Sequence, residues 1–157
     1  MMQIQFSQAE VEMTVRVVYA AVLGLLIGIQ RRGGNTGAGM RTFSLICMGS
    51  ALFTTVGITA FPPGTDTSRM AAQIVTGMGF IGAGVIWRQR EEAIHGITTA
   101  AAIWVTAAVG IAAGVGQYMI AAVVAIITML ILSRGHPLKE AKENIAGETL
   151  DGQKILS

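Results

Sequence analysis

The chain has 157 residues, the size of about one domain, and only 13% of them are Asp, Glu, Lys or Arg, against about 25% in an ordinary soluble domain. Residues 17–133 carry only nine of the 20 charges. A soluble domain cannot cover its surface with uncharged Ala, Val, Ile, Leu and Gly, so this composition argues against a soluble globular protein.

The formal net charge of +2 does not indicate a nucleic-acid partner, because the basic residues are not interleaved with aromatic residues in a stripe. The single cysteine, Cys47, lies in an apolar run. One cysteine excludes an internal disulfide framework and a cysteine-based metal cluster. We expect Cys47 to be a small buried side chain.

Stretches without charge place the membrane-spanning helices, because crossing roughly 30 Å of hydrocarbon takes about 20 mostly apolar residues. Pro62 ends the second stretch, since proline cannot continue a helix. The uncharged run 96–133 is too long for one span and must turn near Gly114 to Gln117. The sequence therefore predicts an all-α polytopic membrane protein with five transmembrane helices at about 13–29, 42–61, 70–87, 97–113 and 118–133.

The basic residues predict the orientation of these five spans, because cytoplasmic loops accumulate Lys and Arg. With five spans, segments 30–41, 88–95 and 134–157 lie on one side and carry nine of the eleven Lys and Arg residues. Arg16 and Arg69 lie on the other side. We therefore expect the N-terminus outside, residues 1–133 as one transmembrane domain, and 134–157 as a short cytoplasmic tail in a bacterial inner-membrane protein.

The N-terminal segment does not resemble a cleavable signal peptide. Such a peptide begins with a positive region, whereas Glu10 and Glu12 precede every Lys and Arg here. We expect the first span to be retained in the mature protein.

Gly77, Gly79 and Gly82 form the pattern G-x-G-x-x-G after apolar residues, which is also the pattern of a dinucleotide-binding turn. That fingerprint needs an acidic residue about 20 positions later, and no acid adjoins Ile97. We therefore expect no nucleotide cofactor. The favoured interpretation is a helix face of small residues, Gly84 included, which lets a neighbouring helix approach closely.

Two other spans also carry regularly spaced small residues. Gly24 and Gly28 stand four residues apart in the first span, and Gly110 and Gly114 repeat the spacing in the fourth. Such positions pack helices within one protomer or form the seam of a homo-oligomer, for example a dimer. The sequence leaves both alternatives open.

The glycine-rich segment 33–42 resembles a phosphate-binding loop at first sight. Its spacing is wrong by one residue, Arg41 stands where a lysine is needed, and no strand precedes it. We expect a cytoplasmic turn. Arg41 and Thr42 remain candidates for contact with an anion or a lipid headgroup.

No catalytic constellation is evident, so we expect no enzyme activity. His95 and His136 lie far apart in flanking segments, and Thr98 and Thr99 are expected to bond within or between helices. Mg²⁺ takes oxygen ligands, and between residues 13 and 133 the carboxylates are Asp66, Glu91 and Glu92. Asp66 is the candidate metal ligand, although its spacing to Arg69 more simply predicts a cap for the third helix.

A set of motifs in fixed order resembles the membrane domain of the MgtC/SapB family over roughly residues 10–133. The matching residues, in chain order, are Gly24-Leu-Leu-Ile-Gly28, Gly39-Met-Arg41-Thr42, Asp66-x-x-Arg69, Gln73-x-Val-x-Gly77-x-Gly79-Phe80-x-Gly82-Ala83-Gly84, Gly96-x-Thr98-Thr99-Ala100-Ala101-x-x-Trp104 and Gly110-x-x-x-Gly114. The resemblance adds Gln73 to the polar candidates. Two departures are expected to matter: Gln30-Arg31 stands in place of the family's Glu-Arg, and we expect a short form without the soluble C-terminal domain of longer members.

The resemblance implies a protein linked to low magnesium, acid resistance and survival inside host cells. It also implies modulation of other membrane proteins, including the F-type ATP synthase, by helix contacts with those proteins and with further copies of the chain. The alternative is an oligomeric transporter or channel for Mg²⁺ or another ion, with Asp66 of several protomers forming a ring.

Overall fold

The structure is a computed structural model that describes residues 7–31, 38–62, 64–88 and 94–133. It is helical throughout, as predicted, apart from one short two-stranded ladder. Its elements in chain order are α1 (Gln8–Ile29), α2 (Met40–Thr59), α3 (Ser68–Val85), β1 (Trp87–Arg88), β2 (Ile94–His95), α4 (Ile97–Val115) and α5 (Tyr118–Ser133).

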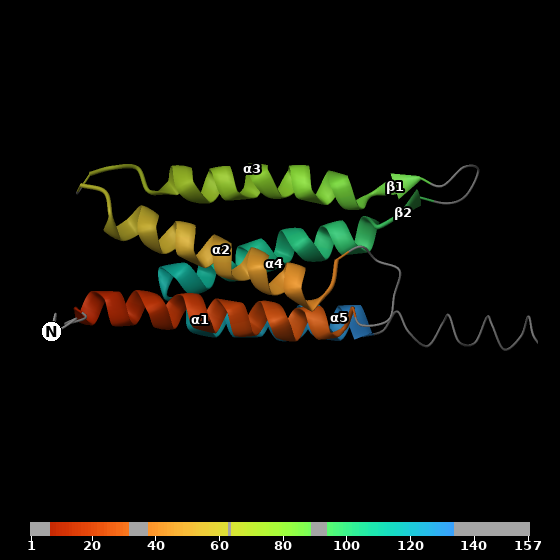
Figure 1. The fold of residues 1–157 in the computed structure, drawn as a ribbon, viewed down its shortest axis with the longest axis horizontal. Helices are drawn as coiled ribbons and strands as arrows, with labels where there is room; N and C mark the ends of the chain where they lie inside the picture. The colour runs from red at the N-terminus through yellow and green to blue at the C-terminus, as the bar shows by residue number, and fades with distance from the viewer. Residues whose placement is uncertain (1–6, 32–37, 63, 89–93, 134–157) are drawn as a thin grey trace, which may run out of the picture.

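The helices run along one common direction and form layers (Figure 1). α2 and α4 occupy the middle, α1 and α5 cover one side of them, and α3 forms the opposite edge. α3 contacts chiefly α4 and touches α2 only sparsely. This arrangement gives α3 the largest share of surface without a neighbouring helix.

Three helices, α1, α2 and α4, are each long and apolar enough to cross a membrane. α5 is an apolar helix of 16 residues, and α3 has 18 residues with several small or polar side chains. Large apolar side chains point outward from all five helices, with Phe80 86% exposed and Met119 77% exposed. Such a surface is typical of a membrane protein.

The helix ends differ from the predicted spans by a few residues, and the reasons are local. α1 begins five residues earlier, at Gln8, because Ser7 and Glu10 form a capping box with reciprocal hydrogen bonds of 3.2 and 2.7 Å. α2 ends at Thr59, before the proline that was expected to stop it. α5 covers the same residues as the last predicted span.

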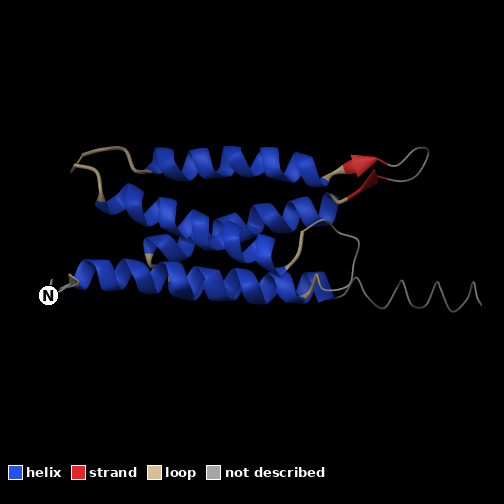
Figure 2. Ribbon diagram, in the orientation of Figure 1, coloured by secondary structure: helices blue, strands red, loops and turns tan. Residues whose placement is uncertain are grey.

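The connection between α3 and α4 is a small hairpin, drawn as red arrows in Figure 2, in which Trp87 pairs with His95. Trp87, the last residue of the predicted third span (70–87), thus lies in β1 beyond the helix. Gly96, which follows the hairpin, has a φ of +91°. A Cβ there would lie 2.3 Å from the carbonyl oxygen of Val85, so only glycine fits this turn.

The turn between α4 and α5 falls within the predicted segment. Gly116 adopts a φ of +93°, and the N–H groups of Gly116 and Gln117 donate to the carbonyls of Ala113 and Ala112 at 3.0 and 2.8 Å. These two bonds close the helix with a left-handed glycine. α5 can then return antiparallel to α4, beside both α4 and α1.

The core lies where α1, α2 and α4 meet. Its fully buried side chains include Ile27, Phe43, Cys47 and Ile103, so Cys47 is buried as expected. Buried threonines on these helices satisfy their hydroxyls locally: Thr55 and Thr106 donate to the carbonyl four residues earlier, each at 2.7 Å. These two hydroxyls therefore need no water as a partner.

Candidate functional site

The predicted polar residues fall into two groups at opposite ends of the bundle. Arg41, Thr42, Thr98 and Thr99 lie where α2 and α4 begin, whereas Asp66, Arg69 and Gln73 lie where α3 begins, just after α2 ends. The 20 residues of α2 separate the two groups by about 30 Å at 1.5 Å per residue. One chain therefore does not assemble all seven into a single site.

At the first end, Arg31 links the end of α1 to the start of α4. Its Nη2 donates a hydrogen bond of 3.0 Å to Oγ1 of Thr99, whose side chain is buried. Burial lowers the pKa of the Arg31 guanidinium, and its Nε is buried without a hydrogen-bond partner in the described part of the chain. This contact was not predicted, because the two residues are 68 positions apart.

The other candidates at this end are more open. Arg41 and Thr98 are exposed and Thr42 is half-buried. The segment 32–37, which carries most of the glycine-rich loop, lies outside the described residues. The interpretation of Arg41 and Thr42 as contacts for an anion or a lipid headgroup therefore remains a prediction.

At the second end, Asp66 organises the entry into α3. Its Oδ1 accepts hydrogen bonds from the backbone N–H and the hydroxyl of Ser68, and these bonds hold the pKa of the carboxyl below its usual value. Thr67, not Asp66, occupies the cap position. Asp66 thus stands one residue before the cap position that was predicted for it, and its side chain still accepts from the first N–H of the helix.

No group of three or more His, Cys, Asp or Glu side chains with metal-binding geometry occurs among the described residues. Asp66 and His95 are exposed, and Glu91, Glu92 and His136 lie outside the described part of the chain. The metal role of Asp66 therefore remains a prediction that would need carboxylates from further protomers.

Arg16 makes a second unpredicted link, between α1 and the end of α4. Its Nη1 donates to the carbonyl of Gly114 at 3.0 Å, and its Nη2 forms an ion pair with Glu12 one turn earlier. A cation at the C-terminal end of a helix interacts favourably with the free carbonyls there. Nearby, the hydroxyl of Tyr19 donates to the carbonyl of Tyr118 at 3.0 Å, which ties α1 to α5.

Four of the predicted packing glycines lie at close helix crossings. A Cβ on Gly24 or Gly28 would lie 2.5 Å from backbone atoms of Phe43 or Met40 in α2. A Cβ on Gly110 would lie 2.3 Å from a backbone carbonyl oxygen of α2, and a Cβ on Gly114 would lie 2.7 Å from another carbonyl oxygen of α2. These glycines bring the backbones of α1 and α4 close to that of α2.

The glycines of α3 behave differently. A Cβ on Gly77, Gly79 or Gly84 would meet no heavy atom of the described chain within 4 Å, and one on Gly82 would make an ordinary contact of 3.6 Å with Ala100. The expected close approach at the first three is therefore not made within one chain. The G-x-G-x-x-G residues lie wholly inside α3, so they do not form the strand–turn–helix of a nucleotide site.

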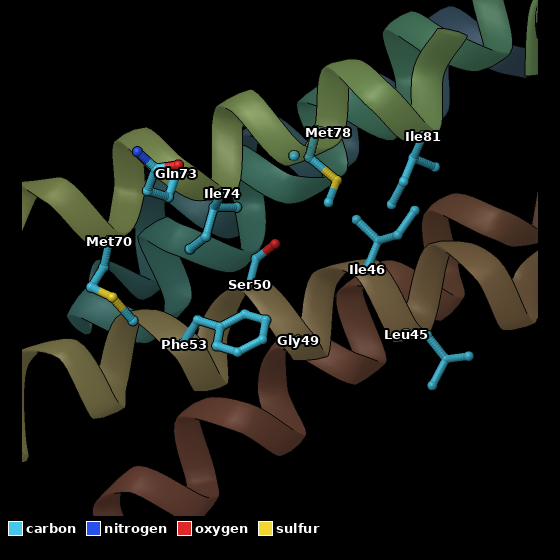
Figure 3. A pocket seen from close by; sticks show the side chains of 11 residues that line it. Leu45, Ile46, Gly49, Ser50, Phe53, Met70, Gln73, Ile74, Met78 and Ile81 are labelled. Carbon is cyan, nitrogen blue, oxygen red and sulfur yellow. The ribbon is translucent and has the colours of Figure 1, made fainter. Parts of the chain in front are cut away.

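An apolar groove of 520 Å³ separates α2 from α3. Figure 3 shows Ile74 and Met78 of α3 facing Ser50 and Phe53 of α2 across it. Its complete lining consists of Leu45, Ile46, Gly49, Ser50, Phe53, Met70, Gln73, Ile74, Gly77, Met78 and Ile81. Gln73, a predicted polar candidate, and Gly77, a predicted packing glycine, both belong to this lining, but sequence periodicity gave no sign of the groove.

Comparison with known proteins gives a consistent relationship. The sequence profile of the MgtC family matches residues 17–141. The putative magnesium transporter YhiD of Escherichia coli K12 is 46% identical over 134 residues, which is 81% of this chain and 62% of that protein. Protein MgtC of Salmonella typhimurium LT2 is 40% identical over 131 residues, 83% of this chain and 54% of that protein.

Protein SrpB of Synechococcus elongatus is 38% identical over 133 residues, 77% of this chain and 73% of that protein. The chain thus spans less than two thirds of the length of YhiD and MgtC. No solved structure matches the chain.

Proposed function

Because the chain belongs to the MgtC family, we propose that it is an inner-membrane protein that modulates other membrane proteins rather than carrying magnesium itself. Its five helices cross the bilayer with the N-terminus outside and the C-terminus in the cytoplasm. Its physiological role is ion homeostasis and adaptation to low magnesium, acid and the interior of host cells. The F-type ATP synthase is the first partner to test.

The distribution of charge supports the five-span topology. Segments 30–41, 88–95 and 134–157 lie on one side in this topology and carry nine of the eleven basic residues. A reporter enzyme fused after Ser157 should be active only in the cytoplasm. Periplasmic activity of that fusion would contradict the topology without bearing on the partner.

The distribution of carboxylates is the observation that favours a modulator over a magnesium carrier. Helices α2, α3, α4 and α5 contain no Asp or Glu, and α1 has its two, Glu10 and Glu12, in its first two turns. A path for Mg²⁺ through a bilayer needs oxygen ligands that replace water along its length. The described helices of one chain offer backbone carbonyls, which already accept hydrogen bonds within the helices. They also offer hydroxyls such as that of Thr55, which already donates to a carbonyl.

The contact surface for a partner is the outer face of α3, which we define as Ala72, Thr76, Gly79, Phe80 and Ala83. All five residues are exposed and share one side of the helix, at spacings of three, four and seven residues. Four of them are small, and small residues let transmembrane helices approach closely. Phe80, 86% exposed, supplies the large side chain that a partner can enclose.

Reconstitution tests this function directly. Vesicles that contain the F-type ATP synthase and this chain should show a changed rate of ATP-driven proton pumping relative to vesicles with the synthase alone. Gly79→Leu should abolish the change, because it makes the outer face of α3 bulky without touching the described chain. Gly77→Leu, on another side of the same helix, is the matched control and should keep the effect. An unchanged pumping rate with the wild-type chain would contradict this partner.

The transporter alternative is supported by one observation, the description of the Escherichia coli relative YhiD as a putative magnesium transporter. It is tested in vesicles that contain this chain alone and a Mg²⁺-sensitive dye. We expect no Mg²⁺ entry above that of protein-free vesicles. Entry that disappears in Asp66→Asn would establish the oligomeric transporter and overturn the modulator.

A further inference from the structure

Each wall of the groove between α2 and α3 contains one glycine. Gly49 of α2 and Gly77 of α3 line it, and a Cβ on either would meet no described atom within 4 Å. A glycine inside a helix costs roughly 0.5–1 kcal/mol relative to alanine. Neither glycine gains a packing contact inside the chain that would offset this cost, so the groove needs an occupant from outside it.

The chemistry of the lining is unfavourable for water. Ser50 and Gln73 are the only polar side chains among the lining residues, and a bound water needs about two to four polar partners, so most of the groove offers water no hydrogen bond. An apolar space left empty also loses dispersion contacts on its walls. The occupant must therefore be a hydrocarbon.

The dimensions of the groove select a thin occupant. On α3 the lining runs from Met70 to Ile81, about 16 Å along the helix axis at 1.5 Å per residue. The volume of 520 Å³ over that length gives a mean cross-section of about 30 Å². This narrow space suits one extended acyl chain better than the helix of a second copy or of another protein, which is at least about 10 Å wide.

The length matches one leaflet of a bilayer. A hydrocarbon core of roughly 30 Å gives one acyl chain a reach of about 15 Å. The groove starts at Met70, within the first turn of α3, and the exposed residues Asp66 and Arg69 precede it. Gln73 lines the groove and is exposed. A guanidinium suits a phosphate and an amide suits an ester carbonyl.

We propose that the α2–α3 groove binds one acyl chain of a membrane phospholipid, with the phosphate beside Arg69 and the ester region beside Gln73. Met70 and Met78, which both line the groove, adapt their flexible side chains to acyl chains of different saturation. This inference rests on the insertion of α3 into the bilayer proposed above, which the reporter fusion tests separately.

Native mass spectrometry of the purified full chain tests the site by counting bound phospholipids after mild delipidation. The wild-type chain and Gly79→Leu should retain one phospholipid, because Gly79 lies on the outer face of α3. Gly77→Leu fills the groove and should lower the bound fraction at least about tenfold, the effect of roughly 1.4 kcal/mol of overpacking. Gly49→Leu, on the opposite wall, should give the same loss and guards against an effect peculiar to α3.

A photoreactive phospholipid with a diazirine in the middle of one acyl chain locates the bound chain. It should label Ile74 and Met78 rather than Phe80, and Gly77→Leu should remove this labelling. Equal lipid retention in all variants, or equal labelling of the groove and the outer face, would indicate ordinary boundary lipid and overturn the proposal. A change of oligomeric state in Gly77→Leu with lipid retained would assign the groove to a second copy and overturn it as well.

Lipid retention and partner modulation can fail separately. Gly79→Leu is expected to lose the effect on the ATP synthase and keep the phospholipid, whereas Gly77→Leu is expected to do the reverse. Loss of the phospholipid in Gly79→Leu would contradict the groove without deciding the partner. A wild-type chain that binds phospholipid but leaves the synthase unchanged would contradict the partner without deciding the groove.

Discussion

Helix α2 packs against two of its neighbours, α4 and α3, in opposite ways. On the α4 side, Gly110 brings the two backbones so close that a Cβ would lie 2.3 Å from the carbonyl oxygen of Cys47. On the α3 side, Gly49 and Gly77 stand on facing walls of a groove of 520 Å³. Glycine thus serves close contact at one boundary and leaves space at the other.

This difference divides the bundle into a firm part and an open part. α1, α2 and α4 supply most of the buried core, and α1 and α4 are also joined by the polar contacts of Arg16 and Arg31. α3 buries only Ile74 and Gly82. Regions with few buried apolar contacts open at lower free energy than the core, so binding partners and ligands are expected to act on α3.

The largest effect is expected from filling a close crossing. Gly110→Ala should lower the free energy of unfolding by about 3 kcal/mol, the upper range for overpacking, because the added Cβ would strike a backbone carbonyl that cannot move freely. Gly79→Ala is the matched control and should raise stability by about 0.5–1 kcal/mol through helix propensity alone. Denaturant unfolding in detergent micelles, followed by circular dichroism, measures both. Equal effects would show that the open face of α3 tolerates a side chain no better than the close crossing of α2 and α4.

Sequence reasoning placed the helices better than it placed their contacts. Charge-free stretches located all five helices to within a few residues, because membrane spans are defined by composition along the chain. Gly77 and Gly110 have similar sequence surroundings, yet a Cβ on one meets nothing and a Cβ on the other meets backbone. The way in which the helices cross decides whether a Cβ meets a neighbouring backbone, and the local sequence periodicity does not encode that crossing.

The polar contacts show the same limit. The hydrogen bond from Arg16 to the carbonyl of Gly114 joins residues 98 positions apart. The sequence assigned Arg16 to the membrane boundary, where a long side chain can reach the headgroups, but gave no reason to select one carbonyl at the end of another helix. The grouping of the seven polar candidates at two ends, by contrast, follows from the helix boundaries alone.

A smaller effect is expected from removing the Arg16 link. Arg16→Met keeps an apolar stem but loses the hydrogen bond to Gly114 and leaves Glu12 without its cation. We expect a loss of about 1.5 kcal/mol of unfolding free energy, the lower end for a hydrogen bond to a charged group, because the side chain is 19% exposed and partly solvated. Arg69→Met, on the exposed start of α3, should change stability by less than about 0.5 kcal/mol. Similar losses in both variants would show that charge, not the link, matters.

At the other end of the core, the effect of Thr99 should be smaller again. Thr99→Val removes the acceptor for Arg31 Nη2 while keeping the shape of the side chain. We expect a loss of about 1 kcal/mol, typical of one hydrogen bond. Thr98→Val, next to it but exposed, should stay within about 0.5 kcal/mol of the wild type. If Thr98→Val were as costly as Thr99→Val, a general need for hydroxyls at the start of α4 would replace the specific contact.

The smallest effect concerns the first turn of α3, where the open part of the bundle is held by Asp66. The hydrogen bonds from Ser68 lower the pKa of this carboxyl in the folded state, so the unfolded chain binds the proton more tightly. The stabilisation is present above the unfolded pKa, near 3.9, and is lost as the pH falls through the lower folded value.

Titration of the Asp66 carboxyl by NMR in micelles should give a pKa that rises toward the ordinary value in Ser68→Ala. Since Asp66 is fully exposed, global stability should hardly change, and the Ser68 amide signal should report the loosened turn. An unaltered pKa in Ser68→Ala would contradict this assignment and leave α3 without a polar anchor at its start.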